Sequence, residues 1–162
     1  MTDAQLKAQF SSQRDNWETP QDFFDRYDRV YHFNLDAASS DENAKCEKHY
    51  TIADDGLHNS WGGYSVWLNP PYGREIGKWV QKAWEESQKP DTVVVMLLPA
   101  RTDTAWFHDY CKRGEITFVR GRLKFGGSVN SAPFPSMVVV FDNRKKEGDS
   151  NSKNNHRKNS RA

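Results

Sequence analysis

The sequence has no apolar run long enough to cross a membrane, and it has few cysteines. Its longest uninterrupted apolar stretch, Val93-Val94-Val95-Met96-Leu97-Leu98, is far shorter than the roughly 20 residues that a transmembrane helix needs. The first residues contain no apolar signal core. Cys46 and Cys111 do not have the spacing of a metal-binding pair, so they are interpreted as reduced thiols. We therefore expect a soluble cytoplasmic protein with no membrane contact and no metal.

A strong excess of either charge is also missing, since 23 Lys and Arg against 22 Asp and Glu give a net charge of +1. The basic residues are concentrated at the carboxyl end: residues 143–162 contain seven Lys or Arg and two acidic residues. This stretch is rich in Asn and Ser, which predicts disorder. Such a tail either holds nucleic-acid phosphates or only keeps the chain soluble, and both interpretations stay open.

The chain has 162 residues, enough for one domain with a real core and too few for two sizeable ones. We divide it into a polar segment (1–16), a single domain (17–142) and the basic tail (143–162). Six Trp, nine Phe and six Tyr are many for this length. They suit a small core and also a site that stacks nucleic-acid bases.

The segment 64–72, with the sequence Tyr-Ser-Val-Trp-Leu-Asn-Pro-Pro-Tyr, is the most informative part of the chain. Its first half is typical of a buried strand, and Pro70 and Pro71 end that strand because they donate no ladder hydrogen bonds. Asn69 therefore lies at the carboxyl end of a strand, where open α/β sheets place their ligands.

This motif can receive a planar group that carries an NH2. The Asn69 side-chain oxygen and the Pro70 carbonyl can accept the two amino hydrogens, and the ring of Tyr72 can stack on the plane. The two prolines hold these groups with little conformational freedom. The alternative is an ordinary Pro-Pro turn with a capping Asn.

At these residues the sequence resembles the S-adenosylmethionine-dependent amino-methyltransferases, which carry Asn/Asp-Pro-Pro-Tyr/Phe after a strand. A narrower resemblance is to the phage-type DNA N6-adenine methyltransferases, which share the Leu-Asp-Ala-Ala, Asn-Ala and Asp-Gly-Leu segments found at 35–38, 43–44 and 55–57. It extends from about Trp17 to Phe141. The resemblance implies an enzyme that acts on DNA in the cytoplasm of a bacterial host cell. We expect a monomer, although the sequence does not reveal the oligomeric state.

Alternating strands and helices predict an α/β fold with right-handed crossovers. Residues 93–98 are typical of a strand buried on both faces of a parallel sheet. Strands at 115–119 and 136–141 come last. The resemblance implies a Rossmann-like S-adenosylmethionine-dependent methyltransferase fold, with a mostly parallel twisted sheet and an antiparallel closing hairpin.

The resemblance also assigns roles to single residues. The catalytic set is Asn69, Pro70, Pro71 and Tyr72. The set expected to bind the cofactor S-adenosylmethionine is Trp17, Thr19, Pro20, Asp36, Ala37, Asp55 and Asn69. In it the Asp36 carboxylate meets the cofactor's ammonium group and Asp55, with Asp54 close behind, meets its adenine.

Two further points concern this cofactor set. Thr19 is also predicted to cap the helix that Pro20 opens. Unlike the broader superfamily, the sequence has no Gly-x-Gly after Asp36. Asp41, Glu42 and Glu47 remain equal candidates for binding the cofactor's ribose hydroxyls.

The loop between the last two strands is the expected DNA contact. Arg120, Arg122 and Lys124 are assigned to phosphates, and Phe134 is assigned, with Tyr72, to stacking on an extruded base. The alternative is that these basic residues only protect an exposed sheet edge.

The sequence thus predicts transfer of a methyl group to N6 of adenine in DNA. The same tetrapeptide also serves cytosine N4, RNA adenine and protein glutamine in related enzymes, and physical reasoning does not separate these amino groups. A catalytically silent nucleic-acid-binding protein of the same fold is the alternative from another class, favoured by the missing glycine-rich loop.

Overall fold

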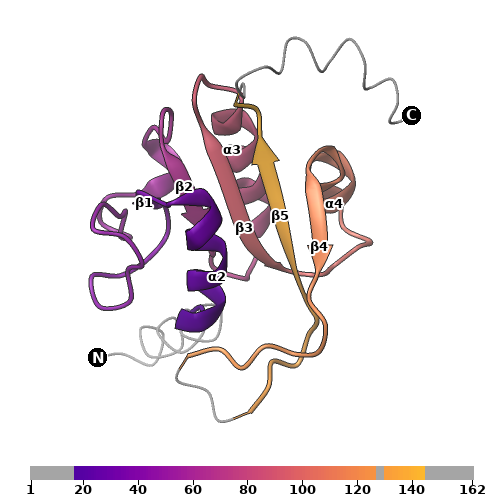
Figure 1. Ribbon diagram of the computed structural model, residues 1–162. Coiled ribbons are helices and arrows are strands. Elements are labelled where there is room, and N and C mark those ends of the chain that lie inside the picture. The colour runs from indigo at the N-terminus through magenta and orange to yellow at the C-terminus, as the bar shows by residue number, and fades with distance from the viewer. Residues whose placement is uncertain (1–16, 127–129, 145–162) are drawn as a thin grey trace, which may run out of the picture.

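A computed structural model describes residues 17–126 and 130–144 of the chain (Figure 1). The polar segment 1–16 and residues 145–162 of the basic tail lie outside these ranges, and the predictions made for them are not addressed by the structure. Within the described part, no helix combines the length and the apolar character needed to span a membrane.

The described residues form a five-stranded mixed sheet with the strand order β1-β2-β3-β5-β4. Its strands are β1 (Leu35–Asp36), β2 (Ser65–Leu68), β3 (Val93–Pro99), β4 (Glu115–Phe118) and β5 (Ser136–Asp142). Strands β1, β2 and β3 pair in parallel, whereas β5 is antiparallel to both β3 and β4. The α/β class and the antiparallel closing pair are therefore confirmed, and the expected parallel character holds for the β1–β3 half.

The helices are α2 (Gln21–Tyr31), α3 (Ile76–Ser87) and α4 (Ala105–Asp109), with short 3-10 turns η1 (Gly56–His58) and η2 (Cys111–Arg113). Figure 1 shows α2 on one face of the sheet and α3 and α4 on the other. Helix α2 packs on the sheet through Phe24, whose ring meets Trp67 edge to face at 5.3 Å. Helix α3 buries Trp79, Val80 and Ala83, an apolar face with helical spacing.

The centre of the core is β3, in which all seven residues are buried. This strand lies between β2 and β5 in the sheet and is covered on both faces, which explains its uninterrupted apolar sequence. Its register with β5 runs without a break from the pair Val93–Asp142 to the pair Pro99–Ser136.

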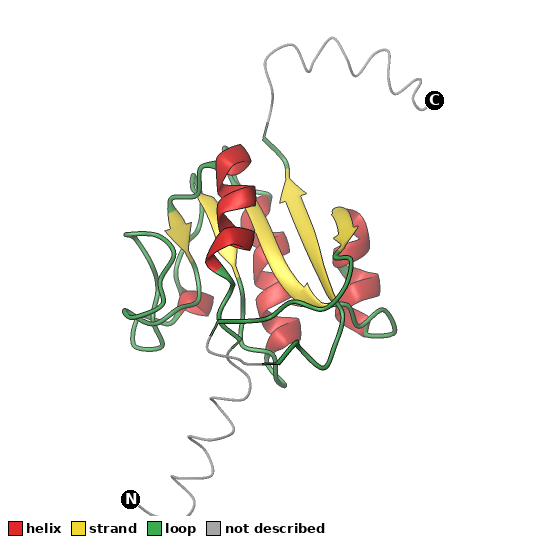
Figure 2. Ribbon diagram, turned by 60° about the horizontal axis from the view of Figure 1, so that its bottom comes forward, coloured by secondary structure: helices red, strands yellow, loops and turns green. Residues whose placement is uncertain are grey.

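The carboxyl ends of β1, β2, β3 and β4 all lie at one edge of the sheet, because β5 alone runs in the opposite direction. Figure 2, turned so that this edge comes forward, shows long loops gathered on it. One of them, between β4 and β5, reaches the segment before α2, where the Gly126 amide donates to the Glu18 carbonyl at 2.8 Å. The carboxyl edge is thus the place to look for a site.

Candidate functional site

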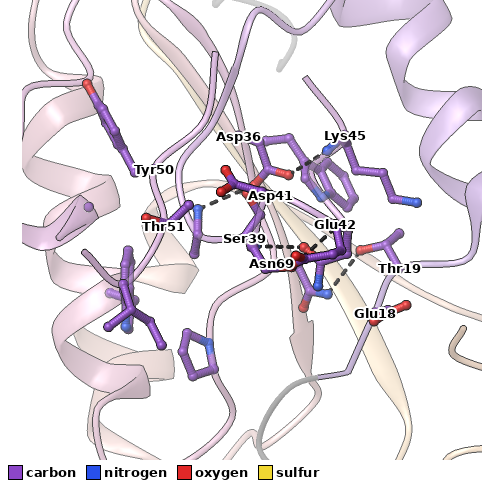
Figure 3. A pocket seen from close by; sticks show the side chains of 18 of the residues that line it. Glu18, Thr19, Asp36, Ser39, Asp41, Glu42, Lys45, Tyr50, Thr51 and Asn69 are labelled. Atoms are coloured by element: carbon purple, nitrogen blue, oxygen red, sulfur yellow. Dashed lines mark hydrogen bonds between the residues drawn. The ribbon is translucent and has the colours of Figure 1, made fainter. Parts of the chain in front are cut away.

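A cavity of about 910 Å³ opens at the carboxyl edge beside the ends of β1 and β2. Its wall comes from segments that are distant in sequence: residues 17–19, the turn after β1, residues 50–57, the end of β2 and the start of α3. Figure 3 shows side chains from these segments facing one another. A volume of this size accommodates a small organic cofactor.

Asp36 is part of this wall, with only 2% of its surface exposed. Its carboxylate accepts hydrogen bonds from the backbone amides of Lys45 at 2.9 Å and Ala38 at 3.3 Å. Burial raises the pKa of the carboxyl from 3.8 to about 6, and the two amide hydrogen bonds offset this only in part. At neutral pH Asp36 therefore carries a buried negative charge, and no cationic side chain within the described ranges is bonded to it, which suits a cationic ligand.

The rest of the wall is acidic as well. Among its described residues, six carboxylic acids face one lysine, Lys45. The Lys45 ammonium donates to the Gln21 side-chain oxygen at 2.7 Å. The acidic wall residues are Glu18, Asp36, Asp41, Glu42, Asp55 and Glu75. Such a wall attracts cations and repels anions.

Asn69 has the most telling geometry at the site. Its side-chain NH2 donates to the Trp17 carbonyl and, at 3.0 Å, to the Thr19 hydroxyl. Its side-chain oxygen is buried and has no hydrogen-bond partner among the residues that the structure describes. The amide is therefore held by its nitrogen, and its oxygen is left as a buried acceptor for a ligand N–H.

This contact corrects the expectation for Thr19. The residue before α2 is Pro20, and no side chain in the described part of the chain caps the helix; the Thr19 hydroxyl is engaged by Asn69 instead. Pro20 itself does not line the cavity; its carbonyl accepts the Phe24 amide at the first turn of the helix. Thr19 and Trp17 do line it.

Ala37 is another residue expected to bind the cofactor. It is fully buried and outside the cavity wall, because its amide donates to the Trp67 carbonyl at 3.1 Å in the β1–β2 pairing. Asp55 lines the cavity, as expected, and adopts a left-handed backbone conformation with φ 62°. Asp54 does not line it, since its carboxylate caps the Thr51 amide at 2.9 Å.

The remaining residues of the motif differ in accessibility. Pro71 lines the cavity, whereas Pro70 is buried behind it. Tyr72 is 5% exposed, and its hydroxyl donates to the Leu97 carbonyl on β3 at 2.8 Å. Its ring lies within 5.6 Å of Phe134 at an interplanar angle of 65°. These contacts cover the Tyr72 ring, and the stacking of Tyr72 on a base stays a prediction.

Phe134 is half-buried and belongs to an aromatic cluster above the motif. It meets Trp17 edge to face at 5.3 Å and Phe125 at 5.9 Å. Phe125, at 1% exposure, also contacts Trp17 and Tyr72. The cluster connects the β4–β5 loop to the Asn69 side of the cavity.

The basic residues predicted for the DNA contact lie outside the cavity. Arg120, Arg122 and Lys124 are exposed on the segment after β4, at the carboxyl edge. Two further exposed arginines, Arg74 after β2 and Arg101 after β3, lie at the same edge and were not predicted. Neither forms an ion pair with any residue that the structure describes. The edge is therefore acidic inside the cavity and basic around it.

Ser39 is a wall residue that the sequence did not single out. Its hydroxyl is buried and unpartnered within the described ranges. The sequence feature that could have pointed to Ser39 is the run of small residues after Asp36. Ala37-Ala38-Ser39-Ser40 occupies the position at which the broader superfamily has its glycine-rich loop.

A family model for DNA N-6-adenine-methyltransferases (Dam) matches residues 7–162 of the chain. A DNA N-6-adenine-methyltransferase from Escherichia phage T1 is 43% identical to it over an alignment 153 residues long, gaps included, and the match takes in 79% of this chain. The match spans 63% of the phage protein, so the chain corresponds to slightly less than two thirds of that relative.

Proposed function

The chain belongs to the DNA N-6-adenine-methyltransferase family, and on this premise we propose that it transfers a methyl group from S-adenosylmethionine to N6 of adenine in DNA. The observation that carries the proposal is the Asn69 side chain, whose NH2 is held by Trp17 and Thr19 while its buried oxygen is left as a free acceptor. We extend the proposal to a Rossmann-like methyltransferase fold, which the three parallel strands and the antiparallel closing pair support.

The cavity fits S-adenosylmethionine in size and in charge. This cofactor carries a positive sulfonium and an ammonium group, and it supplies an electrophilic methyl group. The acidic wall favours both cations, and Asp36 is the buried carboxylate suited to hold the ammonium. Trp17, Thr19, Asp55 and Asn69 complete the binding set that we propose from the expected residues.

Asn69 acts on the amino group of the base. The adenine N6 lone pair is delocalised into the ring, so this nitrogen is a poor nucleophile. The Asn69 oxygen accepts one N6 hydrogen, and the Pro70 carbonyl is proposed as the acceptor of the other. These bonds favour a pyramidal nitrogen, and they strengthen as the nitrogen becomes positively charged during transfer. The extra proton then leaves to water.

Tyr72 and the aromatic cluster hold this arrangement. The Tyr72 hydroxyl ties the motif to β3, so that the turn after Asn69 cannot shift along the strand. Phe134, half-buried beside Trp17, is the ring of the cluster that we propose contacts an extruded base.

The test is incubation of the chain with radiolabelled S-adenosylmethionine and unmethylated duplex DNA, followed by nucleoside digestion and mass spectrometry. N6-methyladenine is the expected product. If the product were N4-methylcytosine, or if only the RNA or protein controls were labelled, the substrate would be one of the other amino groups and not adenine N6 in DNA. A chain that binds DNA and methylates nothing would be the silent nucleic-acid-binding protein.

The titration of Asp36 gives the first prediction. Since the pKa of this carboxyl is about 6, the group loses its charge, and its attraction for the ammonium, as the pH falls through 6. The dissociation constant for S-adenosylmethionine should therefore rise about tenfold between pH 7 and pH 5. Lys45 and His49 are the charged groups facing this carboxyl, and they act against its protonation.

Isothermal titration calorimetry at several pH values measures this dependence. The control is Asp36→Asn, in which the affinity should be lower at pH 7 and change little down to pH 5. If the affinity of the wild type for S-adenosylmethionine were constant from pH 7 to pH 5, Asp36 would not be the residue that binds the ammonium group.

The basic edge gives the second prediction. Replacing Arg120, Arg122 and Lys124 together by glutamine should weaken DNA binding and reduce the slope of log K against log salt by about 0.9 for each phosphate that the protein no longer neutralises. Affinity for S-adenosylmethionine should stay the same, because none of the three lines the cavity.

The matched control is replacement of Arg29 and Lys112, two exposed basic residues on α2 and η2 near the opposite edge of the sheet. Fluorescence anisotropy with a labelled duplex at several salt concentrations compares the variants. Equal slopes for both variants would show that the β4–β5 loop does not contact phosphates.

A further inference from the structure

The Ser39 hydroxyl is unusual in this structure because it is buried without a partner. The backbone amide of Ser39 donates to the Tyr50 carbonyl at 3.0 Å, which fixes the turn, but the side-chain oxygen bonds to no group in residues 17–126 or 130–144. Folded proteins rarely leave a buried hydroxyl unpaired, since an unsatisfied polar group is destabilising. A hydroxyl of this kind on a cavity wall indicates a ligand that completes it.

The pairing of β1 with β2 places Ser39 close to the reaction centre. Asp36 is level with Trp67 in the parallel register, so continuing it brings Ala38 level with Asn69. Ser39 follows directly. Figure 3 shows Ser39 between Asp36 and Asn69 on the cavity wall. The hydroxyl therefore lies between the carboxylate proposed for the ammonium group and the amide proposed for the base.

The charge of the wall narrows the choice of ligand group. The amino-acid end of S-adenosylmethionine carries a carboxylate as well as an ammonium group, and the acidic wall repels the carboxylate. Lys45, the one lysine among the described wall residues, has its ammonium directed to Gln21. A neutral hydroxyl can donate a hydrogen bond to a carboxylate where no free cation is available.

We propose that Ser39 binds the carboxylate of the cofactor's amino-acid end through its hydroxyl, the role that the absent glycine-rich loop leaves open. This inference rests on the proposed function, because it assumes that S-adenosylmethionine occupies the cavity. It goes beyond the assignments above, which give Ser39 no part.

Ser39→Ala tests the inference with two measurements: the affinity for the cofactor should fall, whereas the thermal stability of the free protein should not. The dissociation constant for S-adenosylmethionine, measured by calorimetry, should rise about tenfold, because the variant cannot form the hydrogen bond to the charged carboxylate. The Tm of the free protein should stay the same or rise, because the variant removes an unpartnered buried hydroxyl.

Ser136→Ala is the matched control. Ser136 is 1% exposed, and its hydroxyl is also buried without a partner in the described chain, but it lies at the start of β5 and outside the cavity wall. This variant should keep or raise Tm for the same reason, and it should leave cofactor affinity unchanged. A loss of affinity shared by both variants, or a fall in Tm for Ser39→Ala, would mean that Ser39 has a structural role only.

A third arm identifies the end of the cofactor. Methylthioadenosine keeps the adenine and the ribose but lacks the amino-acid end, so Ser39→Ala should bind it as tightly as the wild type does. An equal loss for both ligands would overturn the assignment to the carboxylate. Unchanged binding of S-adenosylmethionine by Ser39→Ala would overturn the inference alone, whereas a wild-type chain that does not bind this cofactor would overturn the proposed function.

Discussion

Replacing Asn69 by alanine should lower the rate of methyl transfer about 10²- to 10³-fold and raise the dissociation constant for S-adenosylmethionine by only about threefold, because Asn69 is one member of a larger cofactor-binding set. The variant removes the buried oxygen that we assign to the N6 hydrogen, an interaction that strengthens as charge develops on the nitrogen. Single-turnover rates with saturating duplex DNA measure the loss without a contribution from product release.

Asn69 also holds the segment before α2, so a second variant is needed to separate chemistry from positioning. Thr19→Val removes one acceptor of the Asn69 NH2 and keeps the oxygen that faces the ligand. Its rate should fall by about tenfold or less. An Asn69→Ala enzyme with wild-type turnover would exclude the mechanism. If Asn69→Ala and Thr19→Val lost the same fraction of the rate, Asn69 would serve only to position residues 17–19.

Replacing Gly56 by alanine should destabilise the fold by about 3 kcal/mol and abolish binding of the cofactor. An added Cβ would lie 2.2 Å from the Ala37 carbonyl oxygen and 3.1 Å from the Trp79 ring. The backbone after β1 cannot withdraw, because Ala37 is held in the β1–β2 pairing. The clash therefore displaces Asp55 and Leu57, which flank Gly56 and line the cavity.

Gly77→Ala is the matched control for the same chemical change. At this position, within α3, the nearest atom to an added Cβ is Trp106 Cδ1 at 3.5 Å, an ordinary contact distance. Because alanine favours the helix, stability should rise by up to about 1 kcal/mol. Urea unfolding curves compare the two variants, and a Gly56→Ala midpoint equal to that of the wild type would refute the packing argument.

The strands were predictable where a continuous apolar run in the sequence shows that the segment is buried. The apolar run 93–98 and the strand that ends at Asn69 correspond to β3 and β2, with ends that differ by a residue or so. The first strand is very short, since only Leu35 and Asp36 pair with β2 as a ladder. Asp36 makes a second, isolated bridge with His49, and a pairing of this kind has no periodic signal.

Site residues were predictable where their position at a strand end or in a turn is enough to place them in the cavity. They were less predictable where contacts with a distant segment determine their surroundings. Asp36, Asn69 and Asp55 line the cavity as expected. Thr19 resembles a helix cap locally, but Asn69, fifty residues later, takes its hydroxyl. The ring of Tyr72 is covered by Phe125 and Phe134, whose approach depends on the path of the β4–β5 loop. No local pattern reports such contacts.

The position of β5 has a consequence for how the chain folds. This strand comes last among the described strands, yet it lies between β3 and β4, so β4 is hydrogen-bonded to the rest of the described sheet through β5. During synthesis the hydrogen-bonding edge of β3 that faces β5 stays open until Ser136–Asp142 has emerged. The nascent chain thus exposes its most apolar strand to aggregation until nearly the whole fold has been translated.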